Sequence, residues 1–127
     1  MLLYVTLGTN DLYRAGHFYD AVLSPLGYRR QRSSEEEIGY SAEGDTRCRF
    51  WVVTPFNHRR ATSGNGAMVA LAAETRADVD AFHVAAIAAG AVDEGEPGLR
   101  SYHAQFYAAY VRDLDGNKLS AVCENPQ

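Results

Sequence analysis

The sequence has little cysteine, a single lysine and no long apolar run, and each shortage excludes a class of protein. With only Cys48 and Cys123, we expect free thiols in a reducing, cytoplasmic compartment rather than a disulfide scaffold. Lys118 is the sole lysine, the arginines are scattered, and the net charge is −4, so we expect no nucleic-acid partner. No apolar run approaches the roughly 20 residues that span a bilayer, and the opening MLLYVTLGTND lacks the charged start and long apolar stretch of a signal peptide. We therefore expect no membrane association.

The residues that are present indicate one folded domain. The chain has 127 residues, of which 46% are hydrophobic and 22% charged. This apolar fraction is too high for a disordered chain. A domain of this length buries roughly two-thirds of its unfolded surface.

The chain contains an internal repeat. Residues 4–12 alternate in polarity as a strand does, and residues 12–23 have helical spacing that ends at Pro25 and Gly27. The same order of strand, helix and glycine recurs over residues 67–73 and 79–90. A shift of 64 residues superposes the first segment on the second, with Tyr4 on Met68 and Phe18 on Phe82. A duplication explains this order better than chance does.

After each helix, the pattern changes to period two. The expected strands are 28–31, 38–42 and 48–54 in the first half, and 91–93, 104–112 and 118–123 in the second. The Asp-Gly step inside residues 113–117 predicts a hairpin turn. The predicted fold is therefore α+β, with two tandem βαβββ modules. Module 1 spans about residues 1–56, a linker about 57–65, and module 2 about 66–124.

Two such modules set side by side form a curved mixed sheet around a cleft. A helix covers one face of each sheet, and the other faces curve around a shared concave surface. Such a surface is typical of a small-molecule site.

Three segments in order resemble the glyoxalase/bleomycin-resistance/dioxygenase family of the vicinal oxygen chelate superfamily. They are LYVTLGTNDLYRAGHFYDAVLSPLGY, DVDAFHVAAIAAG and YAAYVRDLDGNKLSAV, and the resemblance that they mark extends over nearly the whole chain. The resemblance implies paired βαβββ modules, in agreement with the pattern above, and a homodimer.

The resemblance also implies one divalent metal, held by side chains on the first and last strands of each module. Carried over position by position, these ligands fall on Tyr4, Met68, Ser120, and Trp51 or a residue next to it. None of the four is a strong ligand for a divalent ion, which prefers His, Glu, Asp or Cys. We therefore expect neither the usual metal nor any other cofactor.

Strand parity indicates what these four positions do instead. Alternate side chains share one face of a strand, which places Tyr4, Trp51, Met68 and Ser120 in the cleft. A lining of aromatic and thioether groups suits an apolar or aromatic ligand. The alternative is that these side chains fill the cleft as ordinary core.

Further candidates lie around the long strand of module 2. His103 is a candidate acid, base or ligand contact, because its ordinary pKa permits proton transfer near neutral pH. Arg100 could meet an anionic group of a ligand, and Tyr102 lies between these two residues. Tyr107 and Tyr110 lie on opposite faces of one strand, and the turn register decides which faces the cleft. The prediction favours Tyr107, with both kept as candidate ligand contacts.

Three functions follow as hypotheses. The first is a metal-independent protein that binds an aromatic or amphipathic small molecule in the cleft. The second is a lyase or isomerase in which His103 and a tyrosine replace the metal. The third is a non-catalytic assembly module with a filled cleft. The architecture alone does not choose among them.

Overall fold

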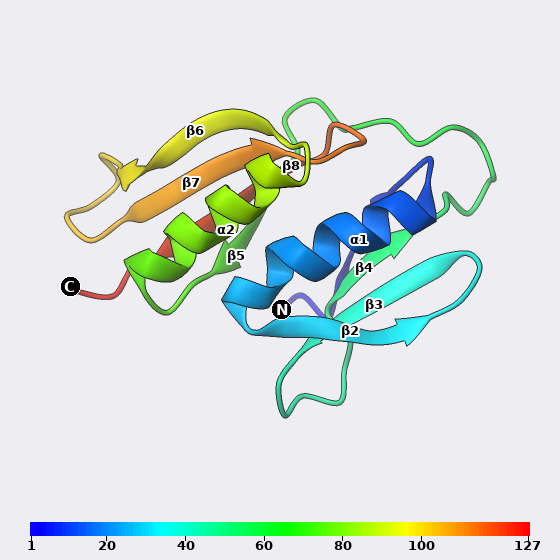
Figure 1. Ribbon diagram of the computed structural model, residues 1–127, viewed down its shortest axis with the longest axis horizontal. Helices are drawn as coiled ribbons and strands as arrows, with labels where there is room; N and C mark the ends of the chain where they lie inside the picture. Colours follow the sequence, from blue (N-terminus) through cyan, green and yellow to red (C-terminus); the bar gives the residue numbers. More distant parts are fainter.

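The computed structural model describes residues 1–127 and contains two four-stranded sheets, each with an α-helix on one face (Figure 1). Module 1 consists of β1 (Val5–Gly8), α1 (Leu12–Leu23), the 3-10 turn η1 (Ser24–Leu26), β2 (Tyr28–Ser33), β3 (Glu37–Ala42) and β4 (Phe50–Val53). Module 2 consists of β5 (Val69–Ala72), α2 (Arg76–Ala88), β6 (Val92–Leu99), β7 (Tyr107–Arg112) and β8 (Lys118–Cys123).

Both sheets have the same topology. Their strand orders are β1-β4-β3-β2 and β5-β8-β7-β6. In each sheet the first strand of the module runs parallel to the last, and the other pairs are antiparallel. The predicted α+β fold of two βαβββ modules is confirmed.

The helix ends follow from local capping. The Asp11 side chain accepts a hydrogen bond from the Arg14 N–H at the start of α1. Thr75 and Asp78 form a capping box at the start of α2. Gly90 then follows α2 with φ 101°, a left-handed conformation that glycine adopts without strain.

Several strand boundaries differ from those expected from the sequence, and three of them have a local reason. β4 begins at Phe50 rather than residue 48, because the Cys48 carbonyl accepts a hydrogen bond from the Trp51 ring. β6 is longer than residues 91–93, because an edge strand tolerates Pro97, which has no N–H to donate. β7 begins at Tyr107 rather than residue 104, because residues 101–106 form a turn.

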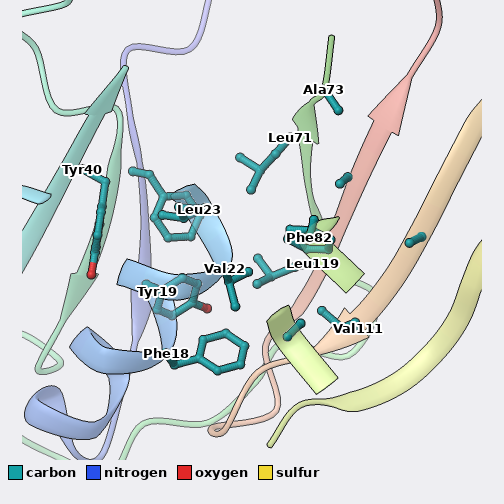
Figure 2. Close-up of a cluster of buried hydrophobic side chains, with 14 of the residues drawn as sticks. Phe18, Tyr19, Val22, Leu23, Tyr40, Leu71, Ala73, Phe82, Val111 and Leu119 are labelled. Atoms are coloured by element: carbon teal, nitrogen blue, oxygen red, sulfur yellow. The ribbon is translucent and has the colours of Figure 1, made fainter. Parts of the chain in front are cut away.

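The two modules share one hydrophobic core between the sheets and helices. Figure 1 shows α1 and α2 side by side on the same face of the two sheets, and the helices contact each other. In Figure 2, Val22 and Leu23 of α1 lie near Phe82 of α2 and near Leu71 and Leu119 of the second sheet. Helix packing therefore joins the modules on this side.

The 113–117 turn adds a polar connection between the modules. Asp113 in this turn is buried and accepts a hydrogen bond from the Tyr19 hydroxyl of α1. Asp115 accepts from the Thr9 hydroxyl (2.6 Å) and the Asn10 N–H (2.9 Å). The Asn117 amide donates to the Gly8 carbonyl at 3.0 Å. The turn of module 2 is thus fixed to the β1–α1 junction of module 1.

The two sheets remain separate at their inner edges. β1 and β5 are edge strands, and no ladder joins them. Side chains of both strands line two small cavities of about 200 and 340 Å³. Neither α1 nor α2 has the length and apolar composition that crossing a bilayer requires.

Candidate functional site

Each sheet has a face away from its helix, here called its open face. On β1 and β5, Val5 and Val69 pack against the core, whereas Thr6 and Ala70 line cavities on the open faces. The predicted strand parity is therefore correct. The residues that it places on the open faces are Tyr4, Trp51, Met68 and Ser120.

At the centre of each open face, two paired strands carry one large and one small side chain, and the order of the two is reversed between the modules. Trp51 on β4 lies beside Gly39 on β3, and a Cβ at Gly39 would be 2.8 Å from the Trp51 ring. At the equivalent place in module 2, Ser120 on β8 lies beside Tyr110 on β7. Each open face therefore has one large and one small side chain at its centre, with the large one on the last strand in module 1 and on the strand before it in module 2.

A large cavity lies on the open face of module 2. Its volume is about 1070 Å³, and residues 65–67, where the linker meets module 2, form part of its lining. It brings together most of the predicted site residues, which are Met68, Arg100, Tyr102, His103, Tyr110 and Ser120.

Tyr110 is the central aromatic side chain of this cavity. The Arg100 guanidinium lies 5.4 Å from the centre of the Tyr110 ring, and the Lys118 ammonium lies 5.7 Å from it. Gly95 on β6 is the strand partner of Tyr110, and a Cβ there would be 2.9 Å from the ring. The glycine therefore leaves room for the ring beside β6.

Tyr107 does not line this cavity, and the preference for Tyr107 over Tyr110 is wrong. Its hydroxyl donates a hydrogen bond to Asp80 on α2 at 2.6 Å, and Arg76 lies over its ring. The hydrogen bond with Asp80 is the main cause of a raised Tyr107 pKa, and burial adds to it. The register of β7 against β8 pairs Tyr110 with Ser120, which decides between the two faces.

Ser120 contributes a polar atom without a partner. The residue is fully buried, and its hydroxyl oxygen forms no hydrogen bond within the protein. A buried hydroxyl without a partner costs free energy. A ligand in the cavity could supply that partner.

Both ring nitrogens of His103 are engaged. Nδ1 accepts a hydrogen bond from the Gln105 N–H at 3.1 Å, which leaves the proton on Nε2. Nε2 lies 2.6 Å from a carboxylate oxygen of Glu124. In this arrangement the ring has no free lone pair to accept a substrate proton, so the geometry does not favour a catalytic base.

Tyr102 lies at the rim of the cavity. Its side chain is 75% exposed and packs against Phe106, with ring centres 4.8 Å apart. Phe106 also touches the His103 ring edge-to-face. The 101–106 turn thus presents three rings at one side of the opening.

Tyr4 and Trp51 line a different cavity, so the expectation of one shared cleft is wrong. This second cavity lies over module 1, has a volume of about 530 Å³, and includes Arg32, Arg47 and Cys48. Burial raises the pKa of the Cys48 thiol, against the opposing effect of the Arg32 charge. The two modules are joined by the packing of α1 against α2, and no ladder joins β1 to β5. The two open faces are therefore separate.

The positions that the resemblance assigns to a metal do not fit one. Their side chains, on Tyr4, Trp51, Met68 and Ser120, are a phenol, an indole, a thioether and a hydroxyl. These groups carry no charge at neutral pH and are poor ligands for a divalent ion. Nowhere in the structure do three or more His, Cys, Asp or Glu side chains gather in a way that could hold a metal.

Several residues that line the cavity are not among the site residues predicted from the sequence, namely Glu94, Phe106, Arg112, Lys118 and Glu124. Parity could have found Lys118, since it lies two residues from Ser120 on the same strand. Glu94 and Glu124 lie on a strand and a terminal segment whose positions depend on pairing between distant residues, for which the sequence has no local signal.

Solved structures provide the comparison. A glyoxalase/bleomycin resistance protein from Albidiferax ferrireducens T118 is 38% identical to the chain, covers 98% of both chains and has a TM-score of 0.86. A glyoxalase/bleomycin resistance protein/dioxygenase family enzyme from Burkholderia phytofirmans PsJN is 22% identical, covers 98% of both chains and has a TM-score of 0.74. A fosfomycin resistance protein from Listeria monocytogenes is 14% identical, covers 98% of this chain and 93% of its own, and has a TM-score of 0.70. The last two show likeness of fold alone. The chain matches no protein-family model and no curated protein.

Proposed function

The chain belongs to the glyoxalase/bleomycin resistance protein family, and from this premise we propose that it binds an aromatic or amphipathic small molecule without a metal. The site is the cavity on the open face of module 2. Its volume of about 1070 Å³ is at the upper end of ordinary small-molecule sites. The cavity is open, so a ligand of ordinary size would cover part of it.

One observation carries this proposal. This cavity has an aromatic side chain, Tyr110, beside a fully buried hydroxyl, Ser120, that has no partner. An apolar ring can stack on Tyr110 and contact the Met68 thioether. A polar substituent on the ligand can then form the hydrogen bond that Ser120 lacks. Small-molecule sites commonly combine such apolar surface with a few polar groups.

The hydrogen bonds of His103 favour binding over catalysis. A catalytic base needs a free lone pair within reach of the substrate proton. The Gln105 N–H and the Glu124 carboxylate occupy the two ring nitrogens. His103 is therefore proposed as a polar group at the opening of the cavity.

The test is calorimetric titration with 2-naphthalenemethanol, a neutral aromatic alcohol. We expect Tyr110→Leu to weaken binding about ten-fold, which corresponds to about 1.4 kcal/mol and is within the range of an aromatic contact. Tyr107→Leu is the matched control, because it removes the same side chain from the opposite face of the same strand. Circular dichroism of both variants checks that they are folded.

The two outcomes are distinct. Wild-type binding that is weakened by Tyr110→Leu alone, and unchanged after treatment with a chelator, supports the proposal. Absence of binding, equal loss in both variants, or loss of binding after chelation would contradict it.

A further inference from the structure

Two cations converge on Tyr110 without a carboxylate partner. The Arg100 guanidinium donates hydrogen bonds only to the backbone carbonyls of Glu96 and Leu99. The Lys118 ammonium forms neither a salt bridge nor a hydrogen bond, and lies 5.7 Å from the centre of the Tyr110 ring. Both charges therefore remain available to a ligand that lies on this ring.

The acidic side chains of the cavity are already paired. Glu94 binds Arg112 with an oxygen–nitrogen distance of 2.5 Å, and Glu124 lies against His103. The three cations of the lining therefore outnumber its two carboxylates, whereas the whole chain has a net charge of −4. The cavity is locally positive on an acidic protein, a distribution that attracts anions.

The position of Arg100 depends on two glycines in β6. A Cβ at Gly98 would be 3.0 Å from one terminal nitrogen of the Arg100 guanidinium, and a Cβ at Gly95 would be 3.3 Å from the other. Gly95 is also the position over which the Tyr110 ring lies. The side chains of Arg100 and Tyr110 thus occupy the space left by the two glycines, and β6 shows register shifts on both sides of Gly95.

From these contacts we infer that the ligand of this cavity is an aromatic anion, whose carboxylate binds between Arg100 and Lys118 while its ring lies on Tyr110. The Ser120 hydroxyl, on the strand partner of Tyr110, is placed to bond to a polar group on the same ligand. An arginine can bind a carboxylate through two parallel hydrogen bonds, and the lysine adds a point charge. This inference depends on the proposed function, since it names the class of ligand for the same cavity.

The test compares two ligands of nearly the same shape, 2-naphthoate and 2-naphthalenemethanol, by calorimetric titration. We expect the carboxylate to bind about ten-fold more tightly than the alcohol, as one charge-assisted contact provides. In an Arg100→Gln, Lys118→Met double variant, the preference should fall to less than about two-fold, with the affinity for the alcohol little changed. Higher salt should weaken binding of the carboxylate more than that of the alcohol, because the two cations are partly exposed.

Arg32→Gln is the matched control, because it removes a cation from the open face of the other sheet. We expect it to leave the preference unchanged. Thermal unfolding of each variant checks that the fold is retained.

The outcomes separate this inference from the proposed function. If both ligands bind equally and in a Tyr110-dependent manner, the anion site is wrong and the proposed function stands. If the preference for the carboxylate persists in the double variant or disappears in Arg32→Gln, the assignment to Arg100 and Lys118 is wrong. If neither ligand binds, the proposed function fails, and this inference fails with it.

Discussion

The two modules share one topology but place their aromatic side chains differently. Module 1 has an aromatic core, and Trp51 covers the centre of its open face. Module 2 has a core of mostly small and aliphatic residues, and the centre of its open face holds Ser120 on β8 beside Tyr110 on β7. The core aromatics of module 1 are Phe18, Tyr19, Tyr40 and Phe50, against Phe82 alone in module 2.

This difference concerns where the large side chain lies on each open face. In module 1 it lies on the last strand, as Trp51, and in module 2 on the strand before it, as Tyr110. The open face of module 1 borders cavities of about 530 and 1100 Å³, and that of module 2 borders one of about 1070 Å³. The same fold therefore gives its two halves open faces of different chemistry, through the residues at two paired positions.

The largest expected effect is a loss of stability when the side chain of Asp113, which connects the two modules, is removed. Asp113→Ala removes the acceptor for the Tyr19 hydroxyl and for the backbone and side-chain amides of Asn117. Buried donors without a partner cost about 1–3 kcal/mol each, so we expect the free energy of unfolding to fall by about 3 kcal/mol or more. Urea denaturation measures it. The control is Asp45→Ala, which breaks an exposed pair with Arg49 and should cost less than about 1 kcal/mol. Equal losses in the two variants would show that the 113–117 turn does not join the modules.

Alkaline pH should destabilise the protein, because two buried tyrosines of module 1 then ionise. Burial, and next the charge of Asp113, raises the pKa of Tyr19 well above its usual value of 10.0. Burial, followed by the hydrogen bond to Asp20, raises the pKa of Tyr40 in the same direction. A raised folded-state pKa means that the stabilisation is complete below about pH 10 and is lost as the pH rises toward the folded-state value.

Each tyrosine lowers the free energy of unfolding by at most about 1.4 kcal/mol per pH unit in that range. Urea denaturation at several alkaline pH values measures the slope, and Tyr19→Phe should reduce it. Ultraviolet absorbance of tyrosinate should show two of the eight tyrosines ionising only on unfolding. A full tyrosinate signal from the folded protein would contradict the assignment.

A smaller difference in stability is expected between two glycine substitutions, one on each open face. Gly39→Ala places a Cβ 2.8 Å from both the Trp51 ring and the buried Cys48 sulfur, so two neighbouring side chains must shift together. We expect a loss of about 1–3 kcal/mol, typical of overpacking. Gly95→Ala meets only the Tyr110 ring and the Arg100 guanidinium, which border an open cavity and can shift. Its cost in thermal or urea unfolding should stay below about 1 kcal/mol, with weaker ligand binding as its main effect. The reverse order of stabilities would contradict the comparison.

The smallest effect is expected at His103. The pair of His103 and Glu124 is exposed, so His103→Ala should change the free energy of unfolding by less than about 1 kcal/mol. We expect the affinity for an aromatic ligand to change by less than about three-fold, because the ring is at the opening and not beside Tyr110. Calorimetry with 2-naphthoate measures the change. Loss of an isomerase or lyase turnover in this variant would instead favour a catalytic His103.

Local patterns in the sequence were sufficient for the fold. Helical spacing together with Pro25 and Gly27 predicted α1 with its observed bounds, and alternation predicted β8 over its full length. Strand parity also placed Met68 and Ser120 on the open face. These are properties of neighbouring residues, which the sequence displays directly.

The site was predicted less completely, because its geometry depends on contacts between distant residues. The choice between Tyr107 and Tyr110 depended on strand register, and parity fixed only that they face opposite ways. The separation of Trp51 from Ser120 depended on how the two sheets sit relative to each other. The pairing of Glu124 with His103 required the chain after β8 to return past the 101–106 turn, for which no motif exists.

The 113–117 turn also bears on the order of folding. Its hydrogen bonds to Gly8, Thr9, Asn10 and Tyr19 connect residues that are about 94 to 109 positions apart in the chain. Such contacts require closure of a loop that includes most of the polypeptide, so they form late and slow the approach to the native state. Once formed, they tie the first helix of the chain to its last hairpin. We therefore expect the two halves to unfold in a single cooperative transition, and a fragment that ends before residue 113 to lack a stable native state.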